Sequence, residues 1–104
     1  MNERRSVRVD QFFFDLLDLQ LGEERGPNGQ ASAGDFLLVD LPLIAEVFAT
    51  RFETLAMPDS NRPEFRSFVT SGLLVPSVFV TGALRSDDVV WLMSVRIDLD
   101  LPWS

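Results

Sequence analysis

The stretch VVWLMSVRIDLDL, residues 89–101, decides the fold class of this 104-residue chain. Its side chains alternate in type, as is typical of a β-strand that buries one face. The more apolar face would carry Trp91, Met93, Val95, Ile97, Leu99 and Leu101. The other face would carry Leu92, Ser94, Arg96, Asp98 and Asp100. We therefore expect a long strand near the end of the sequence, with its polar face toward solvent.

Two further strands are expected before this one. Residues 65–70 are rich in aromatic and β-branched side chains, and Ser71-Gly72 after them predicts a turn. Residues 73–84 are rich in Val and Leu, and their Pro76 fits only an edge or a bulge. Residues 4–9 alternate weakly and predict a short edge strand. Together these segments predict a three- to four-stranded antiparallel sheet.

A first helix is expected from Asp10, as N-cap, to about Leu21, with Gly22 as its C-cap. Gln11, Asp15 and Asp18 would share a polar side. The apolar side would carry Phe12, Phe13, Leu16 and Leu17.

Ser32 and Asp35 resemble a capping box that opens a second helix. Pro42 would bend this helix, which we expect to restart at Asp40. Beyond the bend, an apolar stripe with helical spacing predicts a core-facing side, carried by Leu41, Ile44, Phe48, Phe52 and Leu55.

The fold class we predict is α+β, with a short N-terminal strand and two helices, the second bent at Pro42, packed on the antiparallel sheet. The length fits a single domain over residues 1–104. Residues of about 22–34 contain four Gly and one Pro and predict a mobile loop between the helices.

Several reactive side chains are missing from the sequence. It has no Cys, His, Lys or Tyr, and all nine basic residues are Arg. These absences exclude disulfides, thiolate or Lys nucleophiles, His-based relays and Cys- or His-ligated metals. We therefore expect no cofactor, and a binding protein is favoured over an enzyme.

The formal net charge is −7, and most of the excess acid lies in residues 23–64. Such a charge repels phosphate backbones, so we expect no direct binding to nucleic acid. No apolar run is long enough to cross a membrane, and the sequence has no secretory signal at its start. A cytoplasmic location is the resulting expectation.

The order of expected elements, together with residues 65–98, resembles the toxin superfamily that includes RelE and ParE. The quotable residues are Arg66 in the early strand and Gly72 in the following turn. The resemblance implies a bacterial toxin–antitoxin component with a small partner protein, or a homodimer in its place. Ribosome-dependent members cut mRNA with basic and Tyr residues on the sheet, which this acidic chain lacks. The resemblance therefore favours a protein-binding role without ribonuclease activity.

Five residues are candidates for a binding surface: Arg66, Phe68, Phe79, Arg96 and Trp103. If Val69 and Val80 face the core, Phe68 and Phe79 lie on the exposed side of the sheet. Arg66 and Arg96, with Arg85, would then form a cluster that clamps a carboxylate or phosphate. The simpler alternatives are that the Arg side chains pair with neighbouring acids and that the first helix or the loop covers the aromatic rings.

The leading interpretation is a small acidic protein–protein interaction module. One alternative is a metal-dependent hydrolase or nuclease that uses Asp98 and Asp100, whose carboxylates would be about 7 Å apart on one strand face. A second alternative is an acidic decoy, in which the carboxylates of residues 23–64 occupy a nucleic-acid-binding protein.

Overall fold

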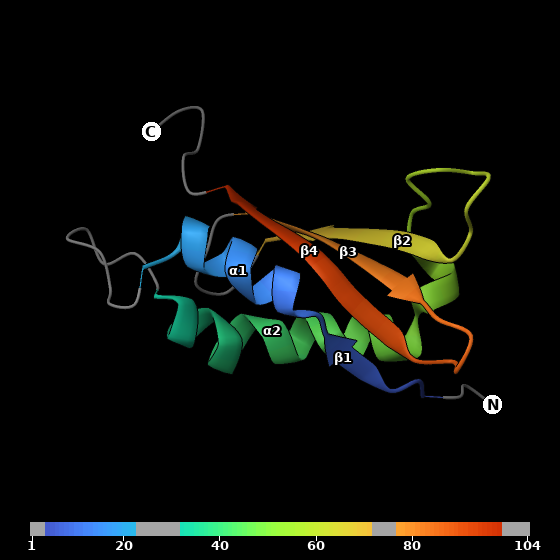
Figure 1. Cartoon of the computed structure of the whole chain (residues 1–104), viewed down its shortest axis with the longest axis horizontal. Helices are drawn as coiled ribbons and strands as arrows, with labels where there is room; N and C mark the ends of the chain where they lie inside the picture. The colour runs from blue at the N-terminus through green and yellow to red at the C-terminus, as the bar shows by residue number, and fades with distance from the viewer. Residues whose placement is uncertain (1–3, 23–31, 72–76, 99–104) are drawn as a thin grey trace.

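The computed structural model describes residues 4–22, 32–71 and 77–98 of the chain. Figure 1 shows the elements in chain order: β1 (Val7–Val9), α1 (Gln11–Gln20), α2 (Ala33–Thr50), the 3₁₀ turn η1 (Phe52–Thr54), β2 (Phe65–Thr70), β3 (Ser77–Leu84) and β4 (Val90–Asp98). The predicted α+β fold class is confirmed.

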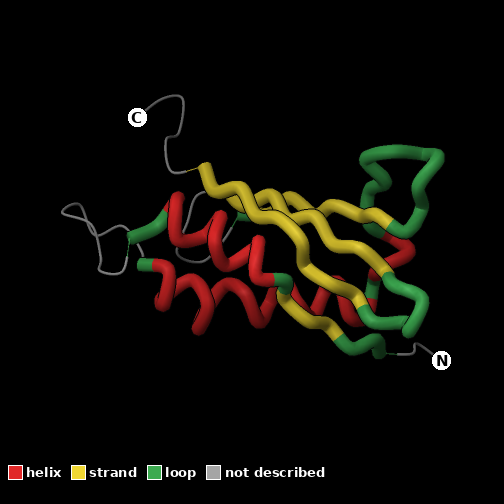
Figure 2. Tube along the Cα trace, in the orientation of Figure 1, coloured by secondary structure: helices red, strands yellow, loops and turns green. Residues whose placement is uncertain are grey.

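The four strands form one sheet in the order β1-β4-β3-β2 (Figure 2). β2, β3 and β4 are antiparallel to their neighbours, whereas β1 runs parallel to β4. The prediction of a purely antiparallel sheet was therefore wrong. Two helices and two strands lie between β1 and β4, and this long connection brings the chain back in the same direction.

The helix α1 begins as the sequence predicts. The side chain of Asp10 accepts a hydrogen bond from the Phe12 amide at 2.9 Å, which satisfies one amide of the first turn. The helix buries Phe13 and Leu17 against the core. It ends one residue earlier than expected, because Leu21 is the C-cap and Gly22 lies beyond it.

The helix α2 opens with the predicted capping box. The Ser32 hydroxyl accepts from the Asp35 amide, and the Asp35 carboxylate accepts from the Ser32 amide, each at 3.1 Å. The helix then runs from Ala33 to Thr50 through Pro42 without interruption. The predicted restart at Asp40 was wrong, because Asp40 is buried within this continuous helix.

The hydrophobic core lies between the helices and one side of the sheet. In Figure 1, α2 crosses below the sheet, α1 lies beside β4, and the upper side of the sheet carries no helix in the described residues. The core consists mainly of Phe13, Leu17, Leu21, Phe36, Ile44, Phe48, Phe52, Val78, Val80, Val90, Leu92, Val95 and Ile97.

A β-bulge shifts the alternation that the sequence predicts for β4. Thr81 of β3 is paired with Ser94, but Gly82 is paired with Leu92, so Met93 is an extra residue. As a result Leu92 is fully buried and Trp91 is only partly so. The predicted sides hold for Ser94 to Asp98 and were wrong for Trp91, Leu92 and Met93.

Parts of the sequence-based prediction lie outside the described residues. These are most of the predicted loop (residues 23–31), Gly72 of the predicted turn, Pro76, and residues 99–104 with Leu99, Asp100, Leu101 and Trp103. The end of that loop prediction was wrong, because Ser32 caps α2 and Ala33 and Gly34 belong to it. No helix in residues 4–22, 32–71 and 77–98 is both long and apolar enough to cross a membrane.

The close approach of α2 to the sheet gives the first prediction. A Cβ on Gly82 would lie 2.8 Å from Cε1 and 3.0 Å from Cδ1 of Phe48. We expect Gly82→Ala to lower the free energy of unfolding by about 1–3 kcal/mol in chemical denaturation, because the packed core resists overfilling.

The matched control is Gly34→Ala, where the nearest atom to the new Cβ is the Ser32 Oγ at 3.8 Å. Since Ala favours helix over Gly, this change should cost nothing and gain at most about 1 kcal/mol. Equal effects of the two substitutions would contradict the packing described here.

Candidate functional site

The side of the sheet that faces away from the helices is the candidate site. We call it the open face and define it by Val69, Phe79, Trp91, Met93, Ser94, Arg96 and Asp98. Phe79 is the centre of one cross-strand row, because it is paired with Val69 on one side and with Arg96 on the other. Val69 is 61% exposed and Phe79 is 38% exposed. The structure therefore brings two predicted binding residues, Phe79 and Arg96, together in adjacent strands.

A shallow groove of about 470 Å³ runs over the open face. Its lining includes Val69, Phe79 and Arg96 from the sheet and Leu16 from α1. Phe12 is one helical turn before Leu16 and is 54% exposed. The exposed side of α1 therefore extends the apolar surface beyond the edge of β4.

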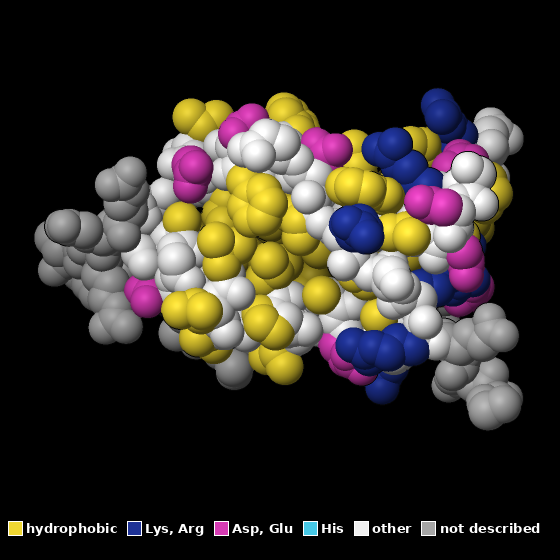
Figure 3. Space-filling model, turned by 60° about the horizontal axis from the view of Figure 1, so that its bottom comes forward, with side chains coloured by type: hydrophobic (Ala, Val, Ile, Leu, Met, Phe, Trp, Pro, Cys, Tyr) yellow, Lys and Arg dark blue, Asp and Glu magenta, His cyan; other side chains and the backbone are white. Residues whose placement is uncertain are grey.

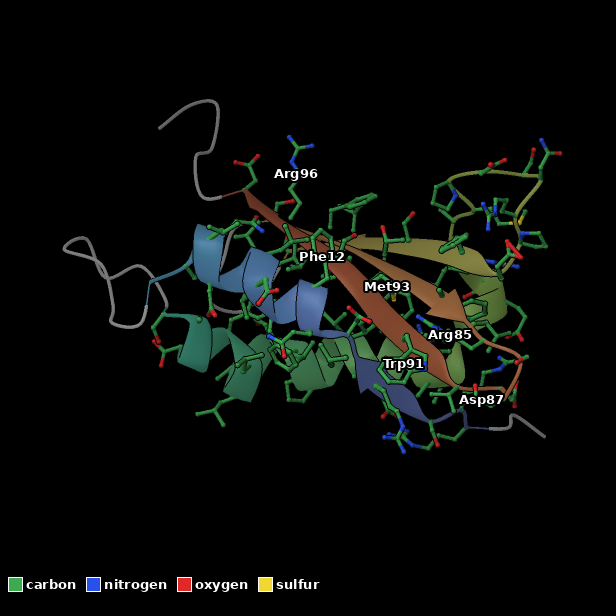
Figure 4. All side chains as sticks on the ribbon, in the orientation of Figure 1. Phe12, Arg85, Asp87, Trp91, Met93 and Arg96 are labelled. Atoms are coloured by element: carbon green, nitrogen blue, oxygen red, sulfur yellow. The ribbon has the colours of Figure 1, made fainter. Side chains whose placement is uncertain are left out.

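The other end of β4 carries Trp91 and Met93. The guanidinium carbon of Arg85 lies 5.4 Å from the centre of the Trp91 ring, and Nη2 of Arg85 lies 3.8 Å from the Met93 sulfur. Figure 4 shows a row along β4 that runs from Arg96 past Phe12 and Met93 to Trp91 and Arg85. The result is an aromatic surface with the Arg85 guanidinium held over Trp91 at one end and the exposed Arg96 at the other.

The Arg side chains of this surface differ from three others in the described residues. Arg4, Arg5 and Arg62 form ion pairs with carboxylates. Within the described residues, Arg85 and Arg96 form none. The same holds for Arg8, which is paired with Trp91 across β1 and β4 and so lies on the same side of the sheet. This surface thus presents cations that no carboxylate of residues 4–22, 32–71 and 77–98 neutralises in an ion pair.

Arg66 is not part of the open face, although the sequence predicted that it joins Arg96. Its guanidinium donates to the carbonyl oxygens of Glu53 at 2.8 Å, Leu55 at 3.0 Å and Pro63 at 3.0 Å. It also lies 5.3 Å from the centre of the Phe52 ring. Arg66 therefore holds the 3₁₀ turn η1 against the start of β2.

Phe68 was predicted on the exposed side of the sheet, and this prediction of its orientation was wrong. Phe68 is paired with the buried Val80, and it packs against the core. It lines a small cavity of about 170 Å³ together with Leu43, Val47 and the buried Asp40. Val69 takes the exposed position instead, because a shift of one residue exchanges the two faces of a strand.

A second exposed apolar patch lies on the helix side of the molecule. Figure 3 shows hydrophobic side chains gathered in the middle of that side, with Arg side chains toward one end and carboxylates toward both ends. The exposed members on α2 include Leu38, Val39 and Leu43. No Arg lies within α1 or α2, so this patch lacks the aromatic–arginine pairs of the open face.

The two alternative functions find no assembled site in the described residues. No three His, Cys, Asp or Glu side chains converge there on a common point that fits a metal ion, and Asp100, the predicted partner of Asp98, lies outside the description. Most of the described carboxylates that were expected to form an acidic decoy are bound to Arg side chains of the chain itself or buried. Glu46, Glu53 and Glu64 pair with Arg side chains, while Asp40 is buried.

The sequence did not predict that Val69, Trp91 and Met93 belong to this surface, nor that Phe12 is exposed beside it. For α1 the signal was present: six of its ten residues are apolar, whereas only Phe13 and Leu17 are buried. A helix that buries only one side needs fewer apolar residues than the six of α1. The additional apolar residues indicated that α1 has a second, exposed apolar side.

Comparisons of this chain with protein-family models, curated proteins and solved structures find no match. The RelE/ParE-like assignment therefore stays a prediction from the sequence.

The structural role of Arg66 and the exposed position of Arg96 can be tested together. Arg66→Gln should lower the free energy of unfolding by about 1–3 kcal/mol, because carbonyl oxygens at η1 lose a charged donor. The matched change Arg96→Gln should alter it by no more than about 0.5 kcal/mol, since Arg96 is an exposed side chain away from packing contacts. Urea denaturation measures both, and a loss at Arg96 as large as that at Arg66 would contradict these roles.

The ion pair between Arg5 and Glu53 gives a pH-dependent prediction. The hydrogen bond from Arg5 lowers the pKa of the Glu53 carboxyl below its usual value. A lowered folded-state pKa adds stability above the unfolded-state pKa, and this stability is lost as pH falls through the folded-state value. Because the Glu53 side chain of this pair is solvent-exposed, Glu53→Gln should cost only about 0.2–1 kcal/mol at pH 7, and nothing below the folded-state pKa.

The measurement is chemical denaturation of the unmodified chain and of Glu53→Gln from pH 7 down to below about 4, which is near the usual pKa of Glu. The difference between their free energies of unfolding should shrink as the pH falls. The control is Asp18→Asn on the exposed side of α1, whose effect should stay within about 0.5 kcal/mol throughout. A Glu53→Gln effect that does not shrink in acid would contradict the ion pair.

Proposed function

We propose that this chain is a non-enzymatic protein-binding module whose contact surface is the open face. The observation that carries the proposal is the row of Phe12, Trp91, Met93, Arg85 and Arg96 along β4 (Figure 4). Trp, Phe, Met and Arg are the residue types enriched at the centres of protein interfaces. A stacked Arg also loses less rotamer freedom on binding than a free one.

The edges of the sheet support contact through its face. The Gln20 side chain bonds with the backbone of β4 beyond the end of β1, at Val95 and Ile97. On the far side, Ala56 forms an isolated bridge with Ser67 of β2. An added strand would find part of each edge already in use, so side chains of the open face are the more accessible contact.

The occupant we propose is a different protein and not a second copy of the chain. If two open faces met with their strands aligned, a parallel arrangement would place Arg96 opposite Arg96. An antiparallel arrangement would place Arg96 opposite Arg85. Like charges that face each other weaken such a pair, so a homodimer is the less favoured alternative.

The proposal includes three expectations that rest on the sequence and the RelE/ParE resemblance alone. They are a toxin–antitoxin-like role without ribonuclease activity, a bacterial source and a cytoplasmic location. The resemblance predicts a small partner protein, which agrees with a surface of this kind.

A photo-crosslinking residue placed at position 79 tests the proposal in the cells that make the protein. We expect Phe79→p-benzoylphenylalanine to give one discrete adduct with a different protein on irradiation. The matched control is the same replacement of Leu38, which is 80% exposed on α2 and should give no such adduct. Mass spectrometry of the adduct distinguishes a different protein from a second copy.

Adducts that form at position 38 and not at position 79 would contradict the choice of surface. An adduct of twice the chain mass would replace the partner with a homodimer. Thermal stabilisation by Mg²⁺ or Mn²⁺ that is lost in Asp98→Asn would favour the metal-dependent enzyme instead.

A further inference from the structure

Resting on the function proposed above, we infer that the partner presents an acidic amphipathic helix to the open face, with carboxylates about two to three turns apart. The inference follows from three properties of the described surface: its cations without ion pairs, the distance between them, and the apolar side chains that separate them.

The charge of the surface selects an acidic partner. The chain has 16 acidic and 9 basic residues, so carboxylates are plentiful. Even so, Arg8, Arg85 and Arg96 form no ion pair in the described residues. A carboxylate brought to Arg85 or Arg96 would gain a charge-assisted hydrogen bond without displacing a carboxylate of the part of the chain that the structure describes. A basic partner would meet like charge at Arg85 and at Arg96, and Asp98, the only carboxylate among the seven residues that define the open face, is already engaged in an interaction.

The spacing of the two Arg groups sets the length of the contact. The Arg85 guanidinium lies over Trp91, and Arg96 is five residues farther along β4. Because Met93 is the extra residue of the bulge, this stretch lies opposite only four steps of β3, from Ala83 to Phe79, which at about 3.3 Å per residue is roughly 13 Å along the sheet. A helix that rises about 1.5 Å per residue spans this distance in about nine residues, so side chains about seven or eleven residues apart, which return to one side after two or three turns, bracket the separation.

The middle of the row is apolar. Figure 4 places Phe12 and Met93 between Arg96 and Trp91, and the groove beside them is lined by Leu16, Phe79 and Val69. An amphipathic helix can present apolar side chains at helical spacing to such a groove while its carboxylates reach the ends. An extended segment would leave most of its backbone groups unpaired, since it would lie on a face and not along an edge.

Designed peptides test the inference with the full chain labelled by ¹⁵N. The acidic probe is a helical peptide with Leu at helical spacing and Glu at three positions, the second about seven and the third about eleven residues after the first. The basic probe has the same sequence with Lys in place of Glu. We expect saturable NMR shifts in β3 and β4 with the acidic probe, and an affinity at least about tenfold weaker for the basic one.

Charge reversal supplies the matched comparison. Arg96→Glu combined with Arg85→Glu should reverse the preference between the two probes. The control is Arg51→Glu, which makes the same kind of charge change at an exposed Arg at the end of α2 and should alter the preference by less than about twofold. The amide spectrum of each variant shows whether it is folded. If the double variant is unfolded, Arg96→Glu alone, at an exposed position, serves for the test.

Four outcomes would overturn the inference: equal binding of the two probes, no binding of either, acidic-probe shifts confined to α2, or tighter binding of a single-stranded oligonucleotide. These outcomes are separate from a failure of the proposed function. If a protein adduct forms at position 79 while the acidic probe does not bind there, the surface is right and the partner chemistry is wrong. If neither occurs, the proposed function itself fails.

Discussion

The side-chain amide of Gln20 provides the contact on which the arrangement of this fold depends. β1 ends opposite Leu92, and the next part of the β4 edge therefore lacks a strand partner. The Gln20 amide nitrogen donates to the Val95 carbonyl at 2.8 Å, and its oxygen accepts from the Ile97 amide at 2.6 Å. One side chain thus satisfies two backbone groups that a strand would otherwise bind. Because this contact fixes α1 beside β4, the helix leaves the open face uncovered and adds Phe12 and Leu16 to its margin.

Local signals in the sequence were sufficient for the elements and for part of the surface. The caps at Asp10 and Ser32 are confirmed, because each depends on side chains close in sequence to the amides they bind. The outward position of Phe79 follows from the burial of Val80, one residue away. Arg96 follows in the same way from Val95 and Ile97. Such inferences work where a single element contains all the information.

The remaining features depend on contacts between elements that no local pattern encodes. The bulge at Met93 changes which side Trp91 occupies, and it is defined only by the pairing of β4 with β3. Phe68 was assigned to the wrong side because the adjacent residues Phe68 and Val69 are both apolar, so the sequence does not show which of them faces the core. The binding of Arg66 to carbonyl oxygens at η1 joins segments more than ten residues apart. The parallel pairing of β1 likewise depends on the path of the whole chain.

The most direct test of this account asks whether the open face is exposed in the free protein. Paramagnetic relaxation by a soluble, neutral gadolinium chelate reports how closely solvent approaches each aromatic ring. The account predicts strong enhancement for the ring protons of Phe79 and Phe12, intermediate enhancement for Trp91, and little for the buried rings of Phe13 and Phe48. If Phe79 and Phe12 were as protected as Phe13, the face would be covered by the chain itself and the account would be wrong.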